Sequence, residues 1–248
     1  LHHRAEPACE RGHVPAVTTL SSAPTAAPPK AVEAEEDGLS RAERVYRHIR
    51  GGIRAGTYRA GQRLREAEIA ASLNTSRTPV REAIRRLEAD RLVEDAPGGG
   101  LTVARLDRQR VHELYMFRAS IEGAAAEMAA LHATELDIAD LSDTLEQMRA
   151  VAEDAPRAAL LNRRFHEGIY RAARNSFLGH AIATMSDFMT LLPGTTYDLP
   201  GRAAEVMLEH ERVLEAIVAR DPGRAARAMR DHIQMASQFR LRMTGISA

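Results

Sequence analysis

The residues in this sequence best suited to chemistry are three histidines, each set in an apolar stripe with the spacing of a helix. His166 lies beside Phe165 and close to Ile169, and His210 and His232 lie in similar stripes of two later segments. Imidazole is the commonest metal ligand among side chains, and its neutral nitrogen suits Zn, Ni, Cu and Fe. Three inward histidines therefore predict a site for a divalent metal ion such as zinc or nickel.

An oxygen donor accompanies the first histidine. Asn162 precedes His166 by four residues, so both side chains should project from one helix face, about 5–6 Å apart at Cβ. Three nitrogens and one oxygen would leave coordination positions open for water or for a carboxylate ligand. The alternative is that each histidine is a hydrogen-bonded core residue, as most single buried histidines are.

A second group of residues has the pattern of a helix-turn-helix that reads DNA. Helical patterns at 66–73 and 78–89 flank a short turn, and Arg77 and Arg81 stand near the start of the second helix, away from its apolar face. A recognition helix places its N-terminal residues against base edges in the major groove, and its free N–H groups face phosphate. The predicted DNA-binding residues are Arg65, Thr75, Ser76, Arg77, Thr78, Pro79, Arg81, Gly99 and Gly100.

Charge and turn residues support this assignment. Residues 40–105 carry 14 basic and 8 acidic side chains, all the basic ones arginine, whereas the chain as a whole has a formal net charge of zero. A basic segment in an otherwise mildly acidic chain is typical of a DNA-binding module. Strand patterns at 92–94 and 101–103 enclose a glycine-rich tip at 96–100, which could approach the DNA backbone closely.

The elements that must position these residues are mostly helices, so the expected fold is mainly α: an N-terminal winged helix-turn-helix followed by an all-α helical bundle. We expect a disordered tail at 1–38, a DNA-binding domain at 39–105 and a helical effector, metal-binding and dimerisation domain at 106–245. Helices are predicted at about 40–55, 66–73, 78–89, 107–131, 135–152, 157–173, 177–192, 203–219 and 222–243. The predicted N-caps of the bundle helices are Thr134, Asp154, Ser176 and Asp221.

Composition narrows the class of protein. Apolar residues make up 44% of the 248 residues, enough for a core, and no apolar run approaches the ~20 residues of a membrane helix. The single cysteine, Cys9, excludes an intrachain disulfide, and no secretion signal pattern is present. We therefore expect no membrane segment and a cytoplasmic location.

Residues 76–83 read Ser-Arg-Thr-Pro-Val-Arg-Glu-Ala, and this octapeptide resembles the winged helix of GntR transcription regulators. The resemblance implies that Arg77 and Arg81 contact bases and phosphates, and that Gly100 is the wing glycine. Many members of the family carry arginine where this chain has Ala67, and Arg65 could supply that contact instead.

Residues 107–243 resemble the FCD effector-binding domain of FadR-type GntR regulators, an all-α bundle. Its metal-binding members use Asp-x-x-x-His followed by two later histidines. The resemblance implies that His166, His210 and His232 are metal ligands, with Asn162 at the aspartate position. Because asparagine is neutral where the family's aspartate is ionised, the net charge of the site is one unit more positive here.

The same resemblance implies two effector contacts. Arg118 stands where the family's inward-facing arginine often meets an anionic effector, and the alternative is an ion pair with Glu122. Asn175 also matches a family position, as either a ligand contact or a helix C-cap.

The sequence thus predicts a DNA-binding transcription regulator rather than an enzyme. It should bind an operator as a homodimer, and a small organic acid bound at the metal should modulate that binding. The alternatives are a metal-dependent enzyme and a DNA-binding protein without an effector. No catalytic residues are predicted, because the sequence has neither Glu-x-x-His on the bundle helices nor His-Glu-x-x-His.

Overall fold

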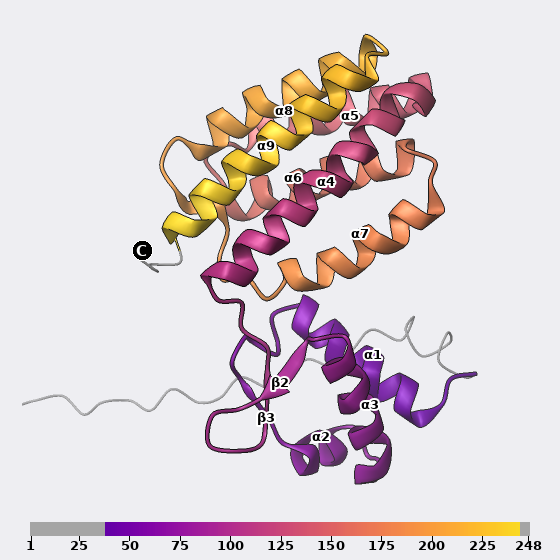
Figure 1. Ribbon diagram of the computed structural model, residues 1–248, viewed down its shortest axis with the longest axis vertical. Coiled ribbons are helices and arrows are strands. Elements are labelled where there is room, and N and C mark those ends of the chain that lie inside the picture. The colour runs from indigo at the N-terminus through magenta and orange to yellow at the C-terminus, as the bar shows by residue number, and fades with distance from the viewer. Residues whose placement is uncertain (1–37, 244–248) are drawn as a thin grey trace, which may run out of the picture. The chain divides into compact units, whose positions relative to one another are not determined.

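A computed structural model describes residues 38–243 of the chain, and Figure 1 shows its elements. The tail predicted at 1–38, Cys9 included, lies outside the described residues except for Gly38, as do 244–248. Among the described helices, none is long and apolar enough to cross a membrane. The predicted mainly α fold is confirmed, with a winged helix-turn-helix followed by a helical bundle (Figure 1).

The winged helix consists of three helices and a small antiparallel sheet. Ser40 begins the first helix, because its side-chain oxygen accepts a hydrogen bond from the Glu43 N–H at 3.1 Å. The sheet has the order β1-β3-β2, so the predicted hairpin β2–β3 is joined by a strand that the sequence analysis missed. The elements are α1 (Arg41–Arg54), β1 (Arg63–Leu64), α2 (Glu66–Ser72), α3 (Arg77–Ala89), β2 (Val93–Asp95) and β3 (Leu101–Val103).

The apolar face of α3 holds the winged helix together. Val80, Ala83, Ile84 and Leu87 recur at helical spacing on α3 and are all buried, packed with apolar residues of α1 such as Ile49. Burying one large aliphatic side chain contributes roughly 1.5–3 kcal/mol. This burial fixes the rotation of α3 and turns its polar face, with Arg77 and Arg81, toward solvent.

The bundle is built on the long helix α4, which lies along α9 (Figure 1). Small residues permit the close approach of these two helices, since Ala125, Ala126 and Ala129 of α4 and Ala225 of α9 have no solvent exposure. The bundle elements are α4 (Arg108–His132), α5 (Glu135–Ala150), α6 (Ala155–Ala172), α7 (Ser176–Met189), the 3-10 turn η2 (Thr196–Asp198), α8 (Arg202–Val218) and α9 (Pro222–Met243).

Three of the four predicted bundle N-caps are present. Thr134 forms a capping box with Asp137, and the Asp154 and Asp221 carboxylates accept hydrogen bonds from backbone N–H groups three residues on. The prediction of Ser176 as a cap was wrong. Asn175 caps α7 instead, because its side-chain oxygen accepts a hydrogen bond from the Leu178 N–H at 3.0 Å. The turn η2, within the predicted long loop before α8, was not expected.

Candidate functional site

The three predicted histidines converge in the interior of the bundle. His166 comes from α6, His210 from α8 and His232 from α9, and all three side chains are buried. One ring nitrogen of each lies within 4.8 Å of those of the other two. The amphipathic pattern that placed each histidine on an inward stripe accounts for their burial, and the packing of α6, α8 and α9 brings their ring nitrogens together.

His210 is the most unusual member of this cluster. It has no solvent exposure, and neither of its ring nitrogens has a hydrogen-bond partner among the described residues. One face of its ring stacks on Phe165, with ring centroids 4.3 Å apart. Burial lowers the pKa of His210 well below its ordinary value, so the ring is neutral with a nitrogen lone pair. A buried polar group without a partner points to a missing ligand.

The other two histidines face each other. Nε2 of His166 lies 3.3 Å from Nε2 of His232. Two nitrogens bound to one tetrahedral zinc ion at about 2.0–2.1 Å would lie about 3.3–3.4 Å apart. Burial lowers the pKa of His232 to about 4, which leaves its ring neutral and able to coordinate at neutral pH. The donors present therefore fit a divalent metal ion such as zinc or nickel.

A buried carboxylate holds the far side of His166. Glu122 of α4 has no solvent exposure, and its Oε2 lies 2.6 Å from Nδ1 of His166. Its Oε1 accepts a hydrogen bond at 2.7 Å from Nε of Arg118, one turn earlier on α4. Burial opposes ionisation, but the charge of Arg118 and the hydrogen bond from His166 keep the pKa of Glu122 well below its ordinary value. Glu122 is thus an ionised partner of a candidate metal ligand.

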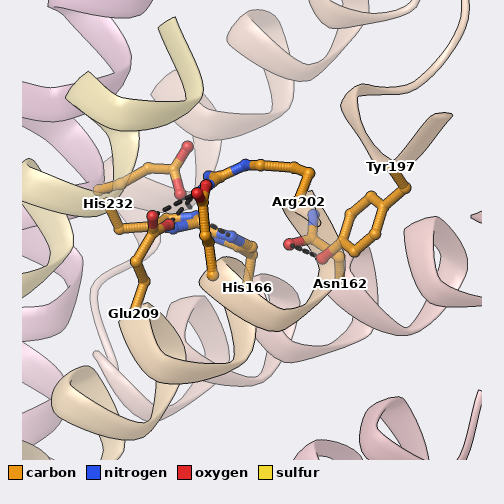
Figure 2. A network of polar contacts seen from close by, with 8 residues as sticks. Asn162, His166, Tyr197, Arg202, Glu209 and His232 are labelled. Carbon is orange, nitrogen blue, oxygen red and sulfur yellow. Dashed lines mark hydrogen bonds and ion pairs between the residues drawn. The ribbon is translucent and has the colours of Figure 1, made fainter. Parts of the chain in front are cut away.

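The same arrangement recurs at His232, as Figure 2 shows. Oε2 of Glu209 lies 2.6 Å from Nδ1 of His232, and Arg202 forms two hydrogen bonds with the Glu209 carboxylate, at 2.7 and 2.9 Å. Burial raises the pKa of Glu209, but the hydrogen bonds from His232 and Arg202 outweigh it and lower the pKa overall. Arg202 itself has a fully buried side chain that lies over the Phe239 ring.

Asn162 lies on α6 one turn before His166, as predicted. Its side-chain oxygen accepts a hydrogen bond at 3.2 Å from the hydroxyl group of Tyr197 in η2 (Figure 2). The turn η2 therefore orients the amide that the sequence pattern assigns to the metal.

The two predicted effector residues have structural partners. Arg118 is buried, and its Nε is paired with Glu122, which is the alternative that the sequence left open. Asn175 uses its oxygen to cap α7, and its Nδ2 donates to the Met128 sulfur at 3.5 Å, so it is an N-cap rather than a C-cap.

A groove of about 680 Å³ runs between α8 and α9. Its lining includes Glu209 and His232, together with Arg212, Arg227 and Asp231. One edge of the histidine cluster is therefore part of a depression that a small polar molecule could enter.

On the winged helix, most of the predicted DNA-binding side chains are exposed. Arg77, Thr78 and Ser76 point to solvent at the start of α3, and Pro79 is half-buried in its first turn. Thr75 differs, because its hydroxyl oxygen is buried with no hydrogen-bond partner among the described residues.

Two of the predicted DNA-binding arginines have exposed ion-pair partners. Nη1 of Arg65 lies 2.8 Å from Glu68, and Nε of Arg81 lies 2.8 Å from Glu66. Exposed pairs of this kind contribute little, about 0–1 kcal/mol, so both arginines can exchange these partners for DNA phosphates or bases.

The wing tip depends on glycine and on an arginine that the sequence analysis missed. Gly99 and Gly100 have φ values of 87° and 84°, a left-handed conformation that residues with a Cβ rarely adopt. Nη2 of Arg63, on β1, donates to the Gly99 carbonyl at 2.6 Å and so ties the tip to the sheet. No signal in the sequence identified Arg63, because a two-residue strand has no periodicity.

The comparisons with known proteins match both halves of this architecture. The family described as bacterial regulatory proteins, gntR family, matches residues 41–103, and the FCD domain matches residues 113–235. A Paenarthrobacter nicotinovorans protein named "Probable D-xylose utilization operon transcriptional repressor" is 36% identical over 177 residues, covering 68% of this chain and 75% of that protein. The chain belongs to the GntR family of bacterial regulatory proteins.

Other GntR relatives extend the comparison. The Bacillus subtilis "Uncharacterized HTH-type transcriptional regulator YdhC" is 28% identical over 175 residues, 69% of this chain and 78% of that protein. The solved structure of Escherichia coli McbR/YncC superposes with a TM-score of 0.67 at 23% identity, covering 83% of this chain and 99% of that chain, and supports the fold. Because the relatives found are transcriptional regulators, this GntR protein is a transcriptional regulator with an FCD effector-binding domain and not a metalloenzyme.

Proposed function

We propose that this GntR regulator binds a pseudo-palindromic DNA operator as a homodimer, and that a small carboxylic acid held at a divalent metal in the FCD domain modulates this binding. The observation that carries the proposal is the buried cluster of His166, His210 and His232, in which both ring nitrogens of His210 have no partner among the described residues. A core of ordinary structural histidines would have paired them.

In this proposal His166, His210 and His232 hold the metal, and Asn162 supplies an oxygen. A bound metal ion supplies a positive centre that offsets the desolvation of an effector carboxylate, which is otherwise costly to bury in an apolar bundle. The guanidinium group of Arg118 would approach the carboxylate from α4, and Asn175 would contact the effector near the start of α7.

Charge balance favours an anionic effector. Around the histidines, Arg118 pairs with Glu122 and Arg202 pairs with Glu209, so these four charges cancel. A divalent ion bound by three neutral histidines and the neutral Asn162 would leave two positive charges in a buried site. An anion that neutralises part of this charge is stabilised by it, whereas a neutral or cationic molecule is not.

The site could influence DNA binding because its ligands come from three helices, α6, α8 and α9. One ion bound by all three favours a single arrangement of the bundle. Only four residues, 104–107, separate β3 from α4, so a shift of α4 can change the spacing of the two DNA heads in a dimer. The coupling must come from different effector affinities of the DNA-competent and incompetent states, typically about 1–3 kcal/mol.

Metal analysis of the purified protein, followed by operator titrations with and without a panel of carboxylic acids, tests the proposal. We expect a stoichiometric divalent metal and at least one acid that changes operator affinity by about 5–150-fold, with the change lost after chelation. A protein that binds its operator but retains no metal and responds to no acid would instead be an effector-independent regulator.

Asn162→Asp should strengthen metal binding. The carboxylate keeps an oxygen that can accept the hydrogen bond from Tyr197 and adds one negative charge beside a divalent ion. We expect zinc affinity to rise about tenfold, ~1.4 kcal/mol. Competition with a chelator of known affinity measures this, with Arg149→Ala, on the exposed side of α5, as the control. Equal or weaker zinc binding by Asn162→Asp would remove residue 162 from the ligand set.

A further inference from the structure

Two parallel chains of charged side chains end on the histidine cluster. One runs from Arg118 through Glu122 to His166. The other runs from Arg202 through Glu209 to His232, as Figure 2 shows. In both, a buried guanidinium holds a carboxylate, and that carboxylate lies 2.6 Å from Nδ1 of the imidazole.

The chains fix which nitrogen of each ring carries the proton. A carboxylate that is paired with an arginine is ionised and can only accept, so Nδ1 of His166 and of His232 must donate. In a neutral imidazole the other nitrogen, Nε2, then has a lone pair. These two Nε2 atoms lie 3.3 Å apart in the buried interior, where two facing lone pairs repel each other unless a cation or a proton lies between them.

We propose that Glu122 and Glu209 are positioning residues of the metal centre, each fixing its histidine in the Nδ1–H form so that Nε2 faces the ion. This inference rests on the metal site of the proposed function. A ligating histidine generally donates its second nitrogen to a carboxylate, carbonyl or water, which orients the ring and raises its basicity. Here two of the three ligands have a charged partner, and His210 has none among the described residues.

A merely structural role for these glutamates would be to neutralise the buried arginines. The surroundings of Arg202 separate the two roles. Nη1 of Arg202 also lies 3.2 Å from Glu205, which is on the same helix as Glu209 but half exposed. Removing the charge of either glutamate weakens the pairing of Arg202. Of these two glutamates only Glu209 contacts a histidine, so only the substitution of Glu209 should weaken metal binding.

The test compares Glu209→Gln with the matched control Glu205→Gln, with zinc alone as the probe and a competing chelator to measure affinity. The amide of Glu209→Gln can still accept from Nδ1, but without the charge that raises the basicity of the ring. We expect about 10–100-fold weaker zinc binding by Glu209→Gln and less than about twofold change for Glu205→Gln. Equal loss in both variants, or no loss in Glu209→Gln, would overturn the inference.

A second measurement needs neither metal nor substitution. Long-range ¹H–¹⁵N correlation spectra of the histidine side chains in the metal-free wild type report the tautomer of each ring. We expect a proton on Nδ1 of both His166 and His232, also where a further proton lies between the two Nε2 atoms, and a ring of either without a proton on Nδ1 would overturn the inference even if zinc binds. If the wild type instead shows the expected Nδ1 protons but binds no zinc, the metal site of the proposed function is wrong. The failure of this inference and the failure of the proposed function are therefore distinguishable.

Discussion

Replacing His210 with leucine should abolish metal binding and, at the same time, raise the stability of the metal-free protein. His210 has no solvent exposure, and both its ring nitrogens are without partners among the described residues. Burying an unpaired polar group costs about 1–3 kcal/mol. Leucine has a similar volume, packs against Phe165 without that penalty and offers no ligand atom. We therefore expect a gain of about 1–3 kcal/mol in the free energy of unfolding.

His166→Leu is the matched control for this prediction. It also removes a metal ligand, but it takes from the fully buried carboxylate of Glu122 the hydrogen bond that His166 donates. A hydrogen bond to a charged group contributes about 1.5–3 kcal/mol, so its loss in the buried interior should destabilise the protein by about that amount. The two substitutions should thus have the same effect on zinc binding and opposite effects on stability.

Thermal unfolding in chelator and in excess zinc measures both effects. Wild type should melt at a higher temperature with zinc, while neither variant should respond to it. In chelator, His210→Leu should melt above wild type, by about 2–4 °C per kcal/mol for a chain of this size. A lower melting temperature for His210→Leu, with zinc stabilisation retained, would return His210 to the role of an ordinary core histidine.

The cluster could be predicted from the sequence because its ligands obey helical periodicity. His166, His210 and His232 each occupy an apolar stripe, and burial of that stripe leaves few other places for the ring to point. The apolar face of α3 in the same way predicts the orientation of that helix, with Arg77 and Arg81 exposed to solvent.

The carboxylates could not be predicted in the same way. Glu209 directly precedes His210, and consecutive side chains on a helix point about 100° apart, so the pattern that buries His210 says nothing of Glu209. Only the packing of α8 against α9 brings Glu209 to His232. Glu122 was recognised as a partner for Arg118 four residues before it, but its contact with α6 depends on how α4 packs in the bundle.

The prediction from sequence failed at one helix start where two neighbouring residues are both good N-caps. It also failed for elements that are too short to show a periodic pattern. Asn175 and Ser176 are both good N-caps, and α7 uses the first of them. The strand β1 has two residues and η2 has three, which is shorter than one repeat of any pattern. Both nevertheless matter for the sites, since β1 carries Arg63 to the wing tip and η2 carries Tyr197 to Asn162.

Arg77→Ala and Arg81→Ala should each severely weaken operator binding. Both side chains are exposed at the start of α3, where a recognition helix meets base edges, and the local excess of arginine attracts phosphate. Loss of one base-contacting arginine removes roughly 1–3 kcal/mol, and a homodimer loses it at two half-sites. Each substitution should therefore weaken binding by about 2–6 kcal/mol, at least thirtyfold.

Titration of the operator at several salt concentrations separates the two kinds of contact. A lost phosphate contact weakens binding to all sequences and lowers the salt dependence by about one counterion per half-site, whereas a lost base contact reduces the preference for the operator over unrelated DNA. Arg149→Ala, with the same change of charge on the exposed side of α5, should leave both quantities unchanged. The ion pair that Arg81 gives up with Glu66 is exposed and contributes little, so the variant should remain folded. Wild-type affinity and salt dependence in both Arg77→Ala and Arg81→Ala would mean that the start of α3 does not contact the operator.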